Sequence, residues 1–264
     1  YNITRLINIH RKKLGLKLIP DAWRDVLGQH VIVASDSVIS KVPADIVEPA
    51  VTQTGYMHLK QTDQLLPELD AFLEAGPPPV YAGFGSMPIR DQIRIVSVIV
   101  EAVRLSGQRA VISKFWDAPS EFSNAADIFF IKKYPHLNLF PKMAAVIHHG
   151  GAGTTATAAI SGVPQIIVPH ILDQYFWGHQ IYRAKLGPRP IWRSELTSKK
   201  LATAILECLS NEDLWQKVRD ASSIIKQQDS IEFTISEILG SLNEYDNIQK
   251  GGNHGNGKSA DRMK

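Results

Sequence analysis

Short apolar segments alternate with helical patterns between residues 80 and 191. The helical patterns are clearest at 91–105 and 155–161. The apolar segments are VYAGF (80–84), AVIS (110–113), IFFI (128–131), AAVIHH (144–149) and QIIVP (165–169). Near-continuous apolar strands separated by helices are typical of a parallel sheet that is covered on both faces. The pattern therefore predicts a doubly wound, Rossmann-like α/β domain.

The segments on either side of this region follow other patterns. Residues 1–60 contain an amphipathic helix, a linker rich in Pro and Asp, and one strand-like run, VIVAS (31–35), which is too little for a core. We expect 1–60 to be the tail of a preceding domain plus a linker, and 61–242 to be the main domain. Helical patterns follow one another after Thr197, and residues 243–264 are rich in Asn, Gly, Lys and Ser, which predicts a flexible polar tail.

Composition excludes several classes of protein. The chain has 264 residues, of which 44% are hydrophobic and 21% are charged, which is typical of a globular enzyme domain. Its formal charge of +3 is spread along the chain, so we expect no nucleic-acid partner. The single cysteine, Cys208, can form no intramolecular disulfide and is expected in the core. We expect a cytoplasmic protein, with peripheral association with a membrane as an alternative.

The glycine-rich stretch HHGGAGTT (148–155) holds the most informative chemistry, because it joins a buried strand to a helix of small residues. Glycines let a phosphate approach the backbone, and the first amides of a helix donate to anionic oxygens. A diphosphate is therefore the expected ligand. The alternative is a tight turn without a ligand. Successive side chains of a strand alternate in direction, so His148 and His149 cannot both face one ligand.

Two other ligands fit parts of the same stretch. Gly151, Gly153 and Ala156 match a dinucleotide-binding pattern, and Asp173 follows at about the required distance of 20 residues. That pattern normally opens its fold, whereas here several strand-like runs precede it, and Asp173 lies beyond Pro169 rather than at a strand end. A metal site is disfavoured because the adjacent histidines lack nearby Cys or carboxylate partners.

The motifs together are more specific. HHGGAGTT is preceded by YPHLNLFPKM (134–143) and followed by GVPQIIVPHILDQYFWG (162–178). In this order and spacing they resemble the donor signature of family 1 glycosyltransferases with the GT-B fold, above all the sterol and antibiotic glycosyltransferases. The resemblance runs from about residue 1 to 242 and covers the C-terminal, donor-binding half of that family.

This resemblance implies a role for each matching residue. The diphosphate of a nucleotide sugar would contact His149, Gly151, Gly153 and Thr154, with a further hydroxyl from Ser86. Asp173 and Gln174 would bind the sugar hydroxyls, and the backbone around Tyr134 and His136 would read the base. Trp116 is our candidate for stacking on the base. The alternatives are a helix cap at Ser86, a solvated loop at Asp173 and Gln174, and a packing role for Trp116.

The resemblance also implies a reaction. The family transfers a sugar with inversion and without a metal or other cofactor, the nucleotide sugar being a co-substrate. We expect a UDP- or TDP-sugar, UDP-glucose above all, and a lipophilic acceptor such as a sterol or an antibiotic aglycone. In the family the catalytic base lies in the N-terminal half, so we expect this fragment to have no catalytic base and little hexosyltransferase activity alone. The alternatives are a nucleotide-binding subunit completed by a partner chain, a sugar-nucleotide epimerase and an NAD-dependent dehydrogenase.

Overall fold

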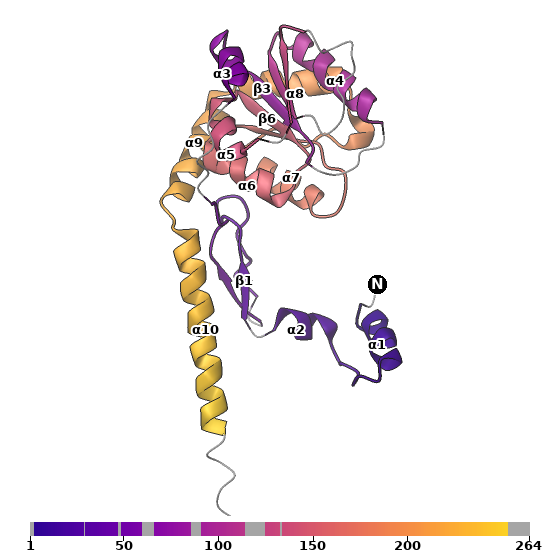
Figure 1. The fold of residues 1–264 in the computed structure, drawn as a ribbon, viewed down its shortest axis with the longest axis vertical. Coiled ribbons are helices and arrows are strands. Elements are labelled where there is room, and N and C mark those ends of the chain that lie inside the picture. The colour runs from indigo at the N-terminus through magenta and orange to yellow at the C-terminus, as the bar shows by residue number, and fades with distance from the viewer. Residues whose placement is uncertain are drawn as a thin grey trace, which may run out of the picture. The chain divides into compact units, whose positions relative to one another are not determined.

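The computed structural model describes the chain in two compact units. It describes residues 3–28, 30–46, 49–59, 66–85, 91–113, 125–132 and 134–252, and only the backbone at 92 and 243–252. The larger unit consists of residues 38–40 and 58–228, and the smaller unit of residues 1–37, 41–57 and 229–264. We describe each unit separately (Figure 1).

The larger unit contains a sheet of five parallel strands. The strands are β3 (Val80–Gly83), β4 (Ala110–Ser113), β5 (Ile128–Ile131), β6 (Ala145–His148) and β7 (Gln165–Ile167). Their order across the sheet is β5-β4-β3-β6-β7, and every neighbouring pair is parallel. The predicted doubly wound α/β fold is confirmed, and each predicted apolar segment contains one strand.

Helices cover both faces of the sheet (Figure 1). They are α3 (Pro67–Glu74), α4 (Gln92–Leu105), α5 (His136–Leu139), α6 (Ala152–Ser161), α7 (Gln174–Arg183), α8 (Ser198–Ser210) and α9 (Glu212–Lys226), with short 3-10 turns at Phe140–Lys142 and Arg193–Glu195. Alternate residues of each strand enter opposite hydrophobic clusters. Val80 and Ala82 pack with α4 and α8, whereas Tyr81 packs with α3 and α5. This explains why the strands read as continuous apolar runs.

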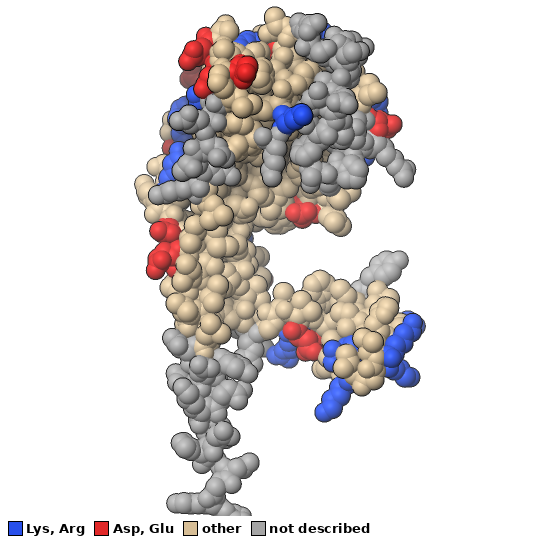
Figure 2. All heavy atoms as spheres, in the orientation of Figure 1, with Lys and Arg blue, Asp and Glu red and all other residues tan. Residues whose placement is uncertain are grey.

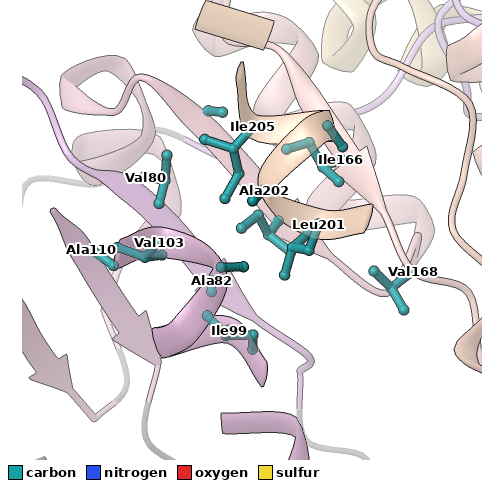
Figure 3. Packing of buried hydrophobic residues seen from close by; sticks show 14 of the residues in the cluster. Val80, Ala82, Ile99, Val103, Ala110, Ile166, Val168, Leu201, Ala202 and Ile205 are labelled. Atoms are coloured by element: carbon teal, nitrogen blue, oxygen red, sulfur yellow. The ribbon is translucent and has the colours of Figure 1, made fainter. Parts of the chain in front are cut away.

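The core under α8 is formed by small and branched side chains. Figure 3 shows Leu201, Ala202 and Ile205 of this helix among residues of β3 and of the outer strand β7, such as Val80, Ala82 and Ile166. Cys208 is buried in the same cluster as a free thiol, which confirms the expected core position. Burial raises the pKa of that thiol, so it stays protonated and unreactive.

The smaller unit contains α1 (Ile3–Lys13), α2 (Ala22–Leu27), a parallel pair of strands, β1 (His30–Val33) and β2 (Ala50–Gln53), and the long helix α10 (Ser230–Gly252). Strand β2 and the first half of α10 are joined by a hydrogen bond of 2.8 Å between the buried hydroxyls of Thr54 and Thr234. His30 of β1 bonds to Ser241 of α10 at 2.7 Å.

Two features of the smaller unit differ from expectation. The strand AVTQ was not predicted, because its alternation of apolar and polar residues is too short to be distinctive. Helix α10 continues to Gly252, past Asn243, where we expected the polar tail to begin. Contacts also group the chain from Asp229 onward with the N-terminal segment rather than with 61–228.

Charge and hydropathy add two observations about the described residues. On the face drawn in Figure 2, acidic and basic side chains of the larger unit are interspersed, with no continuous basic band among them. None of the helices in the described ranges is both long and apolar enough to cross a membrane.

Candidate functional site

The candidate site lies at the carboxyl edge of the sheet, between β3 and β6. The chain leaves β3 towards β4 on one side and leaves β6 towards β7 on the other side. Loops that diverge in this way leave a crevice, where doubly wound sheets bind their ligands. Both strands end in glycine turns with left-handed backbone: Gly85 has φ +66° and Gly150 has φ +86°.

The side chain of His149 lies between the two turns. A Cβ atom on Gly85 would stand 3.0 Å from its Cε1 atom, and a Cβ atom on Gly151 would stand 2.5 Å from its Nε2 atom. Any side chain at these two positions would displace the ring. The glycines therefore hold the imidazole at the mouth of the crevice, half-buried, with a buried Nδ1 atom that has no hydrogen-bond partner among the described residues.

Burial and one neighbouring residue decide how His149 ionises. Burial lowers the pKa of its imidazole below the usual value, and the carboxylate of Asp173 raises it in part. The neutral ring therefore dominates near pH 7, with one nitrogen that donates and one that accepts. A bound anion would favour the protonated form, so this histidine can respond to a charged ligand.

His148, the adjacent residue, is completely buried and has another task. Its Nδ1 atom accepts the Gly150 N–H at 3.0 Å, so the neutral ring donates from Nε2 to the Gln165 side-chain oxygen, also at 3.0 Å. Gln165 in turn donates to the Thr155 carbonyl at 3.2 Å. Burial lowers the pKa of His148 to about 3, so the ring stays neutral and the network stays intact. It fixes the glycine turn against the first turn of α6.

Helix α6 begins immediately after this turn. Its first backbone hydrogen bond joins Thr155 N–H to the Gly151 carbonyl. Gly151 is the N-cap residue, and the helix start has no side-chain cap. The amides of Ala152, Gly153 and Thr154 therefore have no partner within the helix. Together with the helix dipole they form a positive end suited to an anion.

The loop before α7 lies against the same turn. A Cβ atom on Gly150 would stand 2.9 Å from the Gln174 carbonyl oxygen, so only glycine allows this approach. The Gln174 side chain is buried, and its oxygen accepts the N–H groups of His170 (2.8 Å) and Ile171 (3.1 Å). Asp173 is exposed, and its carboxylate accepts the Trp177 indole N–H at 3.1 Å. The loop therefore presents the Asp173 carboxylate beside the His149 ring.

The segment after β5 approaches the site from the other side. The His136 Nε2 atom is 3.0 Å from the Tyr81 hydroxyl, and its ring stacks on Phe140 with centroids 4.5 Å apart. Burial and, to a smaller extent, the nearby His149 lower the pKa of His136 to about 4. The ring of His136 is thus engaged in packing.

Known proteins share this arrangement of motifs. Residues 119–244 match the sequence profile of the Erythromycin biosynthesis protein CIII-like, C-terminal domain. The vancomycin aglycone glucosyltransferase of Amycolatopsis orientalis is 39% identical over 205 residues, which cover 76% of this chain and 49% of that protein. A sterol 3-beta-glucosyltransferase of Arabidopsis thaliana is 36% identical over 187 residues, which cover 69% of this chain and 30% of that protein.

The chain carries a C-terminal domain of family 1 glycosyltransferases. It spans half or less of the length of these two relatives. Among solved structures, the calicheamicin glycosyltransferase CalG4 matches with a TM-score of 0.71 at 15% identity, covering 92% of this chain and 61% of that one. The glycosyltransferase of kitacinnamycin matches with a TM-score of 0.68 at 20% identity, covering 85% and 58%. These neighbours confirm the expected GT-B fold.

The fold of this glycosyltransferase domain brings most of the expected site residues to one edge. The residues His149, Gly151, Gly153, Thr154, Asp173 and Gln174 surround the turn after β6. Tyr134 and His136 follow β5 at the same edge of the sheet. Ser86 and Trp116 lie outside the described residues.

The sequence analysis did not single out two polar residues near the site. Gln165 was included in an apolar run, although a lone amide at the start of a buried strand signals a buried polar partner. His170 packs edge-on against Phe84 with centroids 5.3 Å apart. Burial, Arg193 and His149 lower the pKa of His170 to about 4, so it adds a neutral ring to the site. The sequence could have indicated His170, because it is a polar residue directly after the apolar segment QIIVP.

The described residues offer little to a metal ion. No group of three or more His, Cys, Asp or Glu side chains among them is arranged to hold one. The histidines at this edge make different contacts instead. His148 bonds within the turn, His136 packs on Phe140, and His149 lies between the two glycine turns.

Proposed function

We propose that this domain binds a nucleoside diphosphate sugar, a UDP- or TDP-sugar and most favourably UDP-glucose. The observation that carries the proposal is the position of the His149 ring between two glycine turns, at the start of α6 and beside Asp173. A neutral donor, an open helix end and a carboxylate that interacts electrostatically with the donor match the successive parts of such a ligand.

The diphosphate would bind at the start of α6. Its oxygens would accept from the amides of Gly153 and Thr154 and from the His149 ring, with the helix dipole opposing their charge. As the bond to the sugar breaks, negative charge accumulates on this leaving group. Donors that are already in place stabilise that charge without reorganising, so the site supports transfer without a metal ion.

The sugar would lie towards α7. The Asp173 carboxylate would accept from its hydroxyls, and the Gln174 amide N–H groups would donate to them, since the Gln174 oxygen already serves the loop backbone. The base would lie towards the segment after β5, against the backbone of Tyr134 and His136. In this proposal Trp116 stacks on the base and Ser86 adds a donor to the phosphates.

The rest of the reaction requires groups outside this domain. An acceptor hydroxyl must lose its proton to a general base within hydrogen-bond reach as it attacks the anomeric carbon. We propose that an N-terminal half supplies that base and a pocket for a lipophilic acceptor, such as a sterol or an antibiotic aglycone, and that transfer inverts the anomeric carbon. The domain alone would then bind the donor and transfer it poorly.

Calorimetric titration of the chain with UDP tests the proposal. We expect saturable binding of UDP or TDP, and a His149→Ala variant should bind about tenfold or more weakly, because it loses a hydrogen bond to a charged group. NADH serves as the control ligand and should not bind. Absence of saturable UDP and TDP binding would refute the donor site, and epimerised UDP-glucose without an acceptor would favour the epimerase alternative.

A further inference from the structure

Leu172, the residue before Asp173, has two unfavourable local features. Its side chain is 82% exposed, the highest fraction of any large hydrophobic residue among those described. Its backbone is left-handed, with φ +49°, a conformation that strains residues other than Gly, Asn and Asp. A glycine or asparagine would avoid both costs. An outlier of this kind at a ligand site is grounds for a functional hypothesis.

The exposure of Leu172 does not come from a loose loop. The Gln174 oxygen accepts the N–H groups of His170 and Ile171, and the Tyr175 hydroxyl donates to the His170 carbonyl at 3.1 Å. The loop is thus held before and after Leu172. Its leucine is presented to solvent in a fixed position.

The neighbours of Leu172 extend this apolar surface. Ile171 is 46% exposed, Tyr175 42% and Phe176 47%. The Tyr175 ring lies against Trp192 with centroids 5.2 Å apart, which fixes it further. We call Ile171, Leu172, Tyr175 and Phe176 the apolar rim. Single exposed hydrophobic residues are ordinary, but a group of them beside a polar site marks a binding surface.

We propose that Leu172 is a specificity-determining residue that contacts the apolar body of the acceptor. This inference rests on the proposed donor site. The attacking hydroxyl must come to about 3–3.5 Å from the anomeric carbon of a sugar that Asp173 binds. The part of the acceptor next to that hydroxyl is therefore within reach of the residue beside Asp173. The donor half then selects acceptors with an apolar surface next to their hydroxyl.

Methyl NMR on the chain itself tests this contact. The chain is saturated with UDP and then titrated with dehydroepiandrosterone, a soluble steroid with one 3-hydroxyl group. We expect the methyl resonances of Leu172 to shift, and Leu172→Asn, which removes the apolar contact but tolerates the left-handed backbone, to weaken steroid affinity about tenfold. UDP affinity should stay within about twofold of the unmodified chain.

Leu105 provides the matched control. It is 54% exposed at the end of α4, which leads into the start of β4 and so lies at the opposite edge of the sheet. Leu105→Asn should leave steroid affinity unchanged. A steroid that does not bind, that shifts Leu105 as much as Leu172, or that binds equally well to Leu172→Asn overturns the inference. The UDP titration that precedes the steroid reports separately on the donor site.

Discussion

At the scale of single residues, two adjacent histidines have different environments. His148 is fully buried and bonded at both ring nitrogens, whereas His149 is half-buried with an unpartnered Nδ1 among the described atoms. Strand alternation predicted that only one of them would face a ligand, and the structure shows one ring bonded within the turn and the other half-buried. Which one faces the crevice depends on where β6 ends, and it ends at His148.

The ionisation of His149 predicts how donor affinity depends on pH. Burial lowers the pKa of the free ring, and a bound diphosphate would raise it again, so binding would take up a proton. Affinity should therefore increase as the pH falls through the interval between the bound and free pKa values, and level off below the free value.

Calorimetry between about pH 5 and pH 8 measures this dependence. UDP itself also titrates near the lower end of this range, so the decisive quantity is the ratio of affinities between the unmodified chain and His149→Gln. Glutamine can donate a hydrogen bond but does not titrate. A ratio that is constant with pH would show that His149 does not exchange a proton on binding.

At the scale of elements, the turn between β6 and α6 depends on glycines that approach other backbone closely. A side chain at Gly150 would meet the Gln174 carbonyl and the Ile167 side chain, each at 2.9 Å, and φ at Gly150 is +86°. The sequence HHGGAG predicted a tight turn. It could not reveal that Gly150 contacts Gln174 at the start of α7, because Gln174 lies far along the chain from the turn.

Gly150→Ala should destabilise the larger unit by about 2–4 kcal/mol, since it adds both strain and a clash, and should weaken UDP binding. Gly240 of α10 provides the matched control: an added Cβ there meets nothing within 4 Å. Gly240→Ala should stabilise its helix by about 0.5–1 kcal/mol. Denaturant unfolding measures both. Equal and small effects at the two sites would contradict the observed closeness of the turn to α7.

At the scale of the whole molecule, the two compact units do not follow the order of residues along the chain. Helix α10, at the C-terminal end, belongs to the same compact unit as β1 and β2 near the N-terminal end. The buried hydroxyls of Thr54 and Thr234, 180 positions apart, form one of the bonds that hold this unit together.

Thr234→Val should leave the Thr54 hydroxyl buried without this partner and destabilise the smaller unit by about 1–3 kcal/mol. Hydrogen exchange of β2 and of the start of α10 should accelerate, while UDP affinity stays within about twofold. Thr203→Val on the exposed face of α8, where the hydroxyl bonds only within its own helix, should change neither. Exchange that is unaltered in β2 would rule out this role for Thr234.

The sequence by itself determined the five-stranded parallel sheet, the position of each strand in that sheet and the glycine turn, because near-neighbour periodicity and the steric freedom of glycine are local properties. It did not reveal β2, the bond between α10 and Thr54 or the task of Gln165. Each of these depends on partners distant along the chain, such as Ala50 beside His30, Thr234 beside Thr54 and Gln165 beside His148. Only the tertiary structure decides such contacts, because burial and hydrogen-bond geometry arise where separate elements meet.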